Sequence, residues 1–327
     1  MITGAGAGIG RATAEAFARR GASIGLLARG VERLEAAKKA VEELGGRALV
    51  LVADVADDKA VEAAAERLER EFGPIDIWIN NAMASVFSPI IEMKPEEYRR
   101  VTEVTYLGYV WGTLAALRRM RPRNRGVIVQ VGSALAYRGI PLQSAYCAAK
   151  HAIAGFTDSL RTELIHDKKD IHVCSVEMPA VNTPQFAWVK SRLPNKAQPV
   201  PPIYQPEVPA QAIVFAATHR RREMYVGCPT VLAIVANKIA PGFLDYYLAR
   251  TGFKSQQTDE PKLPNQGDNL FEPLPGDFGA HGAFDDRSRK FSFELWLAEN
   301  RWPAMAGVLT AVIAVLFVLA RARGHSY

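Results

Sequence analysis

The chain has 327 residues, of which 49% are hydrophobic and 23% charged, and its formal net charge at pH 7 is +6. This composition excludes a disordered, collagen-like or disulfide-rich protein, and the length suits one or two folded domains. The mild positive charge suits an anionic cofactor or a membrane surface as well as nucleic acid. Three cysteines, Cys147, Cys174 and Cys228, cannot all pair and lack metal-ligand spacing, so reduced thiols in a cytoplasmic compartment are expected.

From residue 3 to about residue 227, short apolar runs alternate with longer helical patterns. The expected strands are residues 23–28, 48–52, 75–79, 127–131 and 172–176. The expected helices are residues 11–20, 31–44, 58–72, 95–120 and 144–166. Strands that alternate with helices predict a doubly wound α/β fold, with helices on both faces of a parallel sheet. We expect this sheet to belong to a single domain over residues 1–250.

The part of the chain that follows the sheet differs in composition. Residues 227–249 are mostly apolar, and either pack on the sheet or lie on a membrane. Residues 251–300 are rich in proline, glycine and aspartate, and are expected to form a linker.

Residues 303–320 contain no charged side chain. In a helix this stretch spans about 27 Å, which is close to the hydrocarbon thickness of a bilayer. Aromatic and basic residues flank it, as is typical of membrane segments: Trp296, Trp302, Arg321 and Arg323. A transmembrane or membrane-anchoring helix is therefore predicted, and a buried C-terminal helix is the alternative. The flanking arginines favour a C-terminal tail on the cytoplasmic side. The folded domain is expected on that side as well, so the helix either crosses the bilayer despite this rule or lies within one leaflet.

The chain begins with Met1 and Ile2 directly before a glycine-rich loop, without the basic and apolar regions of a signal peptide. The folded domain is therefore expected to be cytoplasmic and membrane-associated. A strand that leads into such a loop usually has about five or six residues, whereas only two are available here. We expect the first strand to be truncated, with a natural start upstream or a sequence that is a fragment.

The loop at residues 3–11, Thr-Gly-Ala-Gly-Ala-Gly-Ile-Gly-Arg, precedes a helical pattern. Glycine lets the backbone approach a pyrophosphate closely, and the following helix N-terminus supplies N–H groups and a positive dipole end. The loop therefore indicates a dinucleotide site, and its candidate contacts are Thr3, Gly4, Gly8, Ile9 and Gly10. A plain tight turn is the alternative.

Arg29 directly follows the strand expected at residues 23–28. In dinucleotide sites an acidic residue near this point binds the ribose of NAD, whereas a guanidinium pairs with the 2′-phosphate of NADP. Arg29 therefore favours NADP over NAD. An ordinary surface arginine that opens a helix is the alternative.

Tyr146 and Lys150 are four residues apart in a helical pattern, so they share one face of that helix. A phenol has a pKa of about 10, and a nearby ammonium lowers it, which eases proton transfer at neutral pH. Ser133 lies just past the strand expected at residues 127–131, where open α/β sheets place their sites, and its hydroxyl can bond to a substrate carbonyl. Each residue alone also suits a helix surface or a cap, but together they indicate one catalytic site.

With these features the chain resembles the short-chain dehydrogenase/reductase family over about residues 1–190. The matching motifs are Thr3-Gly4-xxx-Gly8-x-Gly10, Asp54-Val55, Asn80-Asn81-Ala82, Ser133, Tyr146-xxx-Lys150, and Pro179 with Thr183. The resemblance implies a Rossmann-like fold in a single catalytic domain, a nicotinamide cofactor, and a variable substrate loop at about residues 184–225. It also implies a homodimer or homotetramer built on the helices at residues 98–120 and 144–166.

The resemblance assigns catalytic roles. Tyr146 would be the general acid/base, Lys150 would lower its pKa and bind the nicotinamide ribose, and Ser133 would polarise the carbonyl. The family often has an asparagine on the helix before this serine, where it holds a water for proton relay. This chain has Thr105 there, and a threonine hydroxyl can hold a water with fewer donors and acceptors.

The resemblance also implies contacts along the cofactor. Asp54 and Val55 would touch the adenine, and Thr183 would approach the carboxamide. Asn80 would lie on the adenosine side of the pocket, and the further implied contacts are Ala82, Pro179 and Val181. Met83 and Ala180 stand where the family usually has glycine, and add bulk near the cofactor.

The sequence thus predicts an NADP(H)-dependent oxidoreductase that interconverts an alcohol and a ketone or aldehyde. The expected membrane anchor favours a small lipophilic substrate. Two rivals stay open: a membrane-tethered nucleotide-binding scaffold with weak or vestigial catalysis, and an epimerase, isomerase or lyase on the same scaffold. The six histidines show no ligand spacing, so no metal site is expected, and the basic runs lack interleaved aromatic residues, so no nucleic-acid partner is expected.

Overall fold

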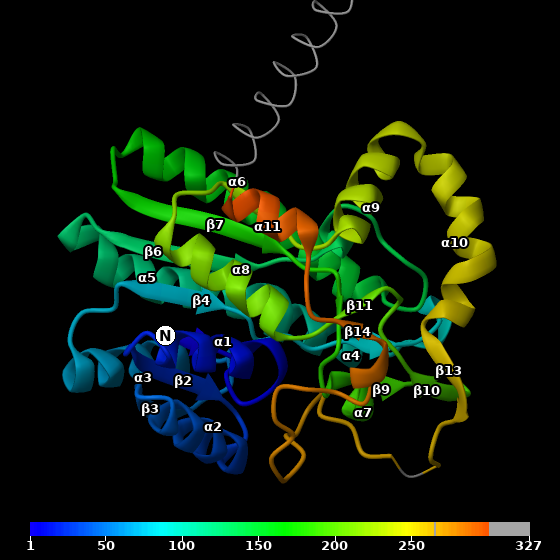
Figure 1. Ribbon diagram of the computed structural model, residues 1–327, viewed down its shortest axis with the longest axis horizontal. Coiled ribbons are helices and arrows are strands. Elements are labelled where there is room, and N and C mark those ends of the chain that lie inside the picture. Colours follow the sequence, from blue (N-terminus) through cyan, green and yellow to red (C-terminus); the bar gives the residue numbers. More distant parts are fainter. Residues whose placement is uncertain (265, 301–327) are drawn as a thin grey trace, which may run out of the picture.

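A computed structural model describes residues 1–264 and 266–300, with a seven-stranded sheet at the centre (Figure 1). The strands in spatial order are β12 (Glu223–Tyr225), β7 (Ile171–Glu177), β6 (Gly126–Val131), β4 (Ile77–Asn80), β1 (Ile2–Thr3), β2 (Ser23–Ala28) and β3 (Arg47–Val52). Every neighbouring pair is parallel. The predicted α/β fold with a parallel sheet is therefore confirmed. The chain crosses from one side of β1 to the other between β3 and β4, and open sheets bind their ligands at such a switch point.

Helices cover both faces of the sheet, each over its own buried apolar cluster. One cluster includes residues of α1 (Gly8–Ala18), α2 (Val31–Glu43) and α8 (Glu207–Thr218). The other includes residues of α3 (Asp58–Phe72), α4 (Pro95–Thr102), α5 (Gly108–Arg123) and α6 (Ser144–His166). The single helix expected over residues 95–120 is divided by a π-helical turn, η2 (Glu103–Leu107), an irregularity that is frequent at functional sites.

Several short elements lie around the carboxyl edge of the sheet. β11 (Ile203–Tyr204) pairs with β8 (Ala180–Val181) and β14 (Ser288–Arg289), and β5 (Val86–Phe87) pairs with β9 (Lys190–Ser191). β10 (Asn195–Ala197) pairs with β13 (Gln257–Pro261) in antiparallel fashion. The short helices are η1 (Ile90–Glu92), η3 (Ala134–Ala136), α7 (Gln185–Trp188), η4 (Asp285–Arg287) and α11 (Phe293–Glu299).

Residues 251–300 do not form the linker that their composition predicts. They contain β13, η4, β14 and α11, which pair with or pack on the main body. Leu270 and Leu295 are only 1% and 3% exposed, so a few well-placed apolar side chains fix a segment that is otherwise polar.

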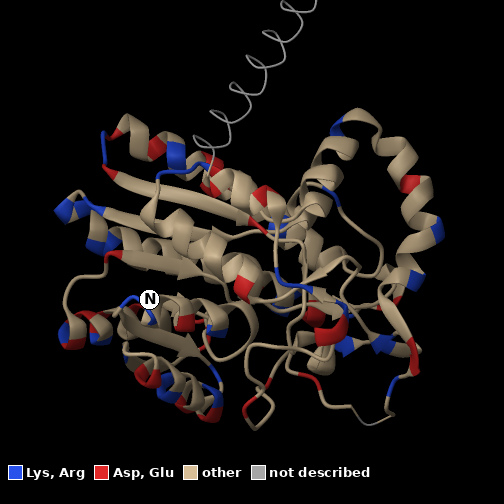
Figure 2. Cartoon of the chain, viewed as in Figure 1, with Lys and Arg blue, Asp and Glu red and all other residues tan. Residues whose placement is uncertain are grey.

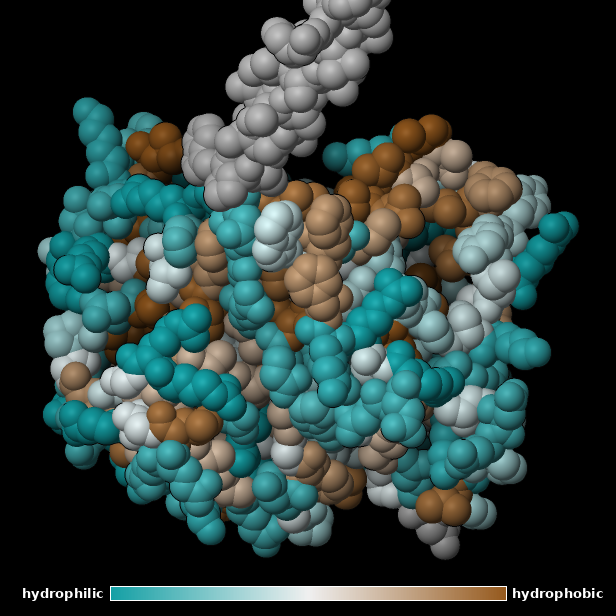
Figure 3. Space-filling model, in the orientation of Figure 1, coloured by the Kyte–Doolittle hydropathy of each residue, from teal (hydrophilic) through white to brown (hydrophobic). Residues whose placement is uncertain are grey.

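α9 (Cys228–Ile239) and α10 (Pro241–Ser255) form a hairpin that projects from the body and packs on η3 rather than on the sheet (Figure 1). Figure 3 shows hydrophobic surface gathered over this hairpin, and the cartoon in Figure 2 shows few charged residues along it. The exposed apolar side chains are Leu232, Val235, Ile239, Phe243, Tyr246, Tyr247 and Phe253. Residues 227–249 thus pack mainly on η3 and not on the sheet, and the alternative that they lie on a membrane stays a prediction.

No helix within residues 1–264 and 266–300 has both the length and the apolarity needed to cross a membrane. The membrane helix predicted at residues 303–320 lies outside the described residues.

Candidate active site

The loop between β1 and α1 adopts a shape that favours glycine. Gly4 and Gly8 have φ angles of +66° and +56°, in the left-handed region. A Cβ on Gly10 would lie 2.2 Å from the carbonyl oxygen of Gly4, so the loop and the first turn of α1 are in direct contact. Gly4, Gly8 and Ile9 line a cavity of about 200 Å³, and Gly10 packs behind them.

Residues after β4 hold this loop in place. The Asn81 side-chain amide donates to the carbonyl oxygens of Thr3 and Gly4, at 2.9 and 3.3 Å. The buried Thr3 hydroxyl accepts from the backbone N–H groups of Asn81 and Ala82, at 2.9 and 3.1 Å. Asn81 and Ala82 line the cavity, whereas Thr3 positions the loop from beneath.

Asn80, predicted on the adenosine side of the pocket, faces away from it. Its side chain is fully buried and bonds to Trp78, Thr113 and Gln130, at 2.8, 3.0 and 2.9 Å. Successive side chains of a strand point to opposite faces, which explains why Asn81 reaches the cavity and Asn80 does not. Asn80 therefore braces the sheet against α5, and Asn81, which belongs to the matched motif but was assigned no role, lies next to the loop.

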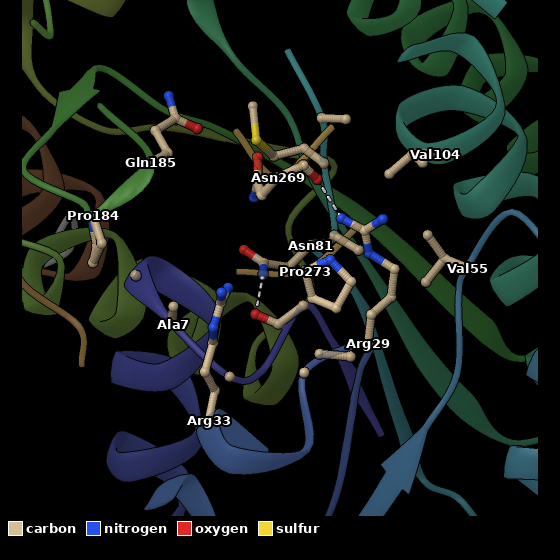
Figure 4. Close-up of a pocket in the computed structure, with 18 of the residues that line it drawn as sticks. Ala7, Arg29, Arg33, Val55, Asn81, Val104, Pro184, Gln185, Asn269 and Pro273 are labelled. Carbon is tan, nitrogen blue, oxygen red and sulfur yellow. Dashed lines mark hydrogen bonds between the residues drawn. The ribbon is translucent and has the colours of Figure 1, made fainter. Parts of the chain in front are cut away.

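Two arginines lie at one end of this cavity (Figure 4). Arg29 follows β2 as expected, and Arg33 comes from the first turn of α2. Burial lowers the pKa of both guanidiniums, with a smaller contribution from repulsion, by Arg100 on Arg29 and by Arg29 on Arg33. Arg33 lies in the first turn of the helix that follows Arg29, and a second basic residue at that position was the signal that could have identified it.

The charge of this cavity is positive. Among the described residues that line it, Arg29 and Arg33 face one carboxylate, that of Asp54. Asp54 is itself paired with Arg100 at 2.5 Å, and lies 4.0 Å from Arg29. Val55 lines the cavity beside Asp54. The Arg29 end of the cavity therefore suits an anionic group.

A second cavity, of about 500 Å³, adjoins the first. Its lining includes all three of Ser133, Tyr146 and Lys150, which come from the η3 loop and α6. The predicted contacts Pro179 and Val181 and the bulky substitution Ala180 also line it. The residues that line both cavities are Ile9, Asn81, Met83, Thr183 and Gln185.

Ser133 is fixed from behind by a buried carboxylate. The Ser133 backbone N–H donates to Oε2 of Glu177 at 2.7 Å, and its hydroxyl accepts from the N–H of Leu135 at 3.1 Å. Glu177 ends β7 and is 2% exposed, and this burial raises its pKa to about 7 against the opposing effects of Ser133 and Lys150. The sequence did not single out Glu177, although an acid at the carboxyl end of a buried strand was an available signal.

Lys150 is buried beside two tyrosines. Its ammonium donates to the carbonyl of Val131 at 2.6 Å and to the Tyr109 hydroxyl at 3.2 Å, and lies 5.5 Å from the centre of the Tyr146 ring. Burial lowers the Lys150 pKa to about 7, with Glu177 acting in the opposite direction. Tyr109 is a further residue that the sequence did not single out.

The pKa of the Tyr146 phenol is shifted upward in the structure, whereas the sequence predicts a downward shift. Burial is the largest cause, and a hydrogen bond with Ser133 offsets it only in part. The Lys150 ammonium donates its hydrogen bonds to Val131 and Tyr109. Its positive charge therefore acts on Tyr146 from above the aromatic ring, 5.5 Å from the ring centre.

Thr105, predicted to hold a relay water, lies away from both cavity linings. It is fully buried in η2, and its hydroxyl donates to the carbonyl of Ala84 and accepts from the N–H of Ala84, both at 2.9 Å. The single hydroxyl proton is therefore used within the protein. Thr105 fixes the segment at Ala84, which lines the cavity of the glycine loop, and a relay role for Thr105 finds no support.

A family model described as short chain dehydrogenase matches residues 1–193, which is more than half of the chain. The chain belongs to the short-chain dehydrogenase family. It is thus an oxidoreductase of a family that uses nicotinamide cofactors. In the described part of this short-chain dehydrogenase, no cluster of His, Cys, Asp and Glu side chains could hold a metal ion.

Named relatives share much of the chain. An uncharacterized oxidoreductase of Bacillus subtilis, YxnA, is 32% identical over 83% of this chain and 77% of its own length. A levodione reductase of Leifsonia aquatica is 33% identical over 72% of this chain and 85% of its own. The crystal structure of a 3-ketoacyl-ACP reductase from Sinorhizobium meliloti is similar with a TM-score of 0.60 and 29% identity, over 69% of this chain and 95% of that one.

Proposed function

We propose that this short-chain dehydrogenase interconverts an alcohol and a carbonyl compound with NADP(H) as cofactor. The observation that carries the proposal is that Ser133, Tyr146 and Lys150 line one cavity, which adjoins the cavity of the glycine loop. The left-handed Gly4 and Gly8 at the start of α1 fit a dinucleotide pyrophosphate. When bound, the nicotinamide supplies or accepts the hydride.

Three side chains carry out the proton chemistry. Ser133, oriented by the Leu135 N–H, donates a hydrogen bond to the substrate oxygen. Tyr146 gives its proton to that oxygen during reduction and takes it back during oxidation. Ser133 and Tyr146 line the same cavity and Ser133 lowers the pKa of the Tyr146 phenol, which supports this pairing. The Lys150 ammonium lies over the Tyr146 ring and stabilises negative charge as it develops on the phenol.

The cavity of the glycine loop is here called the nucleotide cavity, and the preference for NADP rests on its positive charge at the Arg29 end. A guanidinium matches the geometry of a phosphate and forms charge-assisted hydrogen bonds with it. Arg29 and Arg33 both line this end, and the Asp54 carboxylate there is already paired with Arg100. A 2′-phosphate would balance the excess of positive charge, whereas the free hydroxyl of NAD would not.

The second cavity, which Ser133, Tyr146 and Lys150 line, is here called the catalytic cavity, and its apolar walls favour a lipophilic substrate. α9 and α10 contribute apolar side chains to its lining, namely Leu232, Ala233, Ala236, Leu244 and Leu248. A fatty acyl-CoA reductase of Acinetobacter baylyi, 32% identical over 74% of this chain, is named for a substrate with a long apolar chain. We therefore expect long-chain or bulky apolar carbonyl compounds to be reduced better than short polar ones.

Membrane association with a cytoplasmic catalytic domain belongs to the same proposal. The uncharged stretch at residues 303–320 would anchor the chain in a bilayer. The exposed apolar face of the α9–α10 hairpin would rest on the lipid at the entrance of the catalytic cavity. Assembly into a homodimer or homotetramer through α5 and α6 remains a prediction.

The test is NADPH oxidation by the detergent-solubilised full chain with ketones and aldehydes of increasing chain length, with identification of the product. We expect net cofactor oxidation and an alcohol product, with turnover at least about 100-fold lower in Tyr146→Phe. This variant should still bind NADPH. Product formed without net cofactor oxidation would favour an epimerase or lyase, and tight NADPH binding without turnover of any compound would favour the scaffold.

A further inference from the structure

A segment remote from the glycine loop in sequence closes one side of the nucleotide cavity. Residues 267–282, here called the strap, lie between β13 and η4 (Figure 1). Asn269 and Pro273 of the strap line the cavity together with Arg29, and Figure 4 shows the hydrogen bond between Arg29 and Asn269. The wall of the cavity thus includes residues whose composition predicted a linker.

Two apolar side chains anchor the strap to the body. Leu270 is 1% exposed and belongs to the buried cluster under α3–α6. Phe278 packs edge-on against Trp188 of α7, with ring centroids 4.6 Å apart. The Arg33 guanidinium lies 4.6 Å from the Trp188 centroid and 4.8 Å from that of Phe278, in cation–π geometry. The strap, α7 and Arg33 therefore pack as one unit.

Backbone carbonyls of the strap engage donors that line the cavity. Arg29 donates to two of them, both at 2.5 Å, and Arg33 donates to two more. The backbone N–H of Gly8, in the glycine loop, donates to a further one at 3.0 Å. The accepting carbonyls are those of Asn269, Phe271, Leu274, Gly276 and Gly279.

These contacts couple the strap to whatever fills the cavity. The Gly8 N–H is a single donor, so it bonds well either to Gly279 or to a phosphate oxygen. A guanidinium carries five N–H donors in one fixed plane, so a strap that holds two of them also fixes the direction of the others. Closing the strap therefore orients Arg29 and Arg33. A bound pyrophosphate competes with the Gly279 carbonyl, near the C-terminal end of the strap, for the Gly8 N–H.

We propose that the strap is a lid of the nucleotide site, which opens to admit or release the cofactor and, when closed, orients Arg29 and Arg33 toward the 2′-phosphate. This inference rests on the proposed NADP(H)-dependent function. The pyrophosphate takes the Gly8 N–H from Gly279, and the arginine contacts hold the rest of the strap shut. Loosening the strap should speed up cofactor release and weaken the preference for NADPH over NADH, since both depend on the closed position.

The test compares NADPH release from the full-length wild type with release from Phe278→Ala and Leu270→Ala. Release is followed by stopped-flow fluorescence after addition of excess NADP+. Phe291→Ala is the control, because this ring is 60% exposed and lies outside the strap. We expect release at least about 10-fold faster in the two anchor variants and within about twofold of wild type in the control. The ratio of NADPH to NADH affinity should fall in the anchor variants only.

Hydrogen exchange of the strap amides gives a readout that does not depend on turnover. Exchange should slow when NADPH is added to the wild type, and less so in Phe278→Ala. Unchanged release in Phe278→Ala would overturn the lid and leave the proposed function intact, and this variant keeps the test valid even if Leu270→Ala fails to fold. A folded wild type that binds neither NADPH nor NADH would instead contradict the proposed function, and the lid with it.

Discussion

Replacing Lys150 by Met should abolish turnover and yet stabilise the protein below neutral pH. Lys150 is 2% exposed, and burial lowers the pKa of its ammonium from 10.5 to about 7. At 1.36 kcal/mol per unit, this shift corresponds to about 5 kcal/mol of lost stability at about pH 6. Methionine has a similar length without a charge, so the variant avoids that loss.

The variant also loses the stabilisation that two hydrogen bonds of Lys150 provide. The bonds from Lys150 to Val131 and to Tyr109, at 2.6 and 3.2 Å, disappear in the variant. Each contributes about 1 kcal/mol as a neutral hydrogen bond, so the expected net gain is about 3 kcal/mol at about pH 6.

The sign of the pH dependence follows from the lowered pKa. Between about pH 7 and pH 10.5 the unfolded chain binds a proton at Lys150 that the folded protein does not, so wild-type stability from this group rises with pH. At about pH 9.5 the remaining loss is only about 1 kcal/mol, which no longer exceeds the cost of the lost bonds. The advantage of Lys150→Met should therefore be present near pH 6 and absent near pH 9.5.

The assay is urea unfolding of the detergent-solubilised full chain at both pH values, with Lys39→Met as control. The Lys39 side chain is 79% exposed, so its replacement should change the free energy of unfolding little at either pH. A Lys150→Met variant that is less stable than wild type near pH 6, or whose stability difference from wild type does not change with pH, would refute this reasoning.

Three further predictions concern the cofactor, the core and the membrane. Arg29→Ala should raise the NADPH dissociation constant about 10- to 100-fold and change that for NADH far less, as fluorescence titration would measure. Thr105→Ala loses both bonds to Ala84 and should lower the free energy of unfolding by about 1–3 kcal/mol, while turnover persists in the folded fraction. Phe243→Asp should raise the KM for a long-chain carbonyl presented in lipid vesicles and leave that for a short soluble one unchanged.

The parts of the site that the sequence identified have a local chemical reason to be where they are. The glycine loop needs left-handed backbone at Gly4 and Gly8, and the spacing of Tyr146 and Lys150 follows from the helical repeat. The alternation of strands and helices likewise predicts a parallel sheet, because each crossover helix returns the chain to the end of the sheet where the previous strand began.

The strap could not be predicted because most of its hydrogen bonds are accepted by backbone carbonyls, which every residue type carries. Its proline, glycine and aspartate content is that of a linker, and only Leu270 and Phe278 hint at anchorage. That Asn81 rather than Asn80 faces the cavity has a different cause, since the exact bounds of the strand decide which of two neighbouring side chains points to which face. The upward shift of the Tyr146 pKa depends on burial, which spacing along a helix does not reveal.

The central claim is that this chain transfers a hydride between NADP(H) and a carbonyl carbon, with Tyr146 moving the proton. The most direct measurement uses NADPH that carries deuterium at the reactive carbon of its nicotinamide, together with an apolar ketone or aldehyde and the full-length enzyme. The account predicts deuterium on the carbinol carbon of the product with wild type, and almost none in the same time with Tyr146→Phe. Deuterium retained in the cofactor while product forms, or equal transfer by Tyr146→Phe, would contradict it.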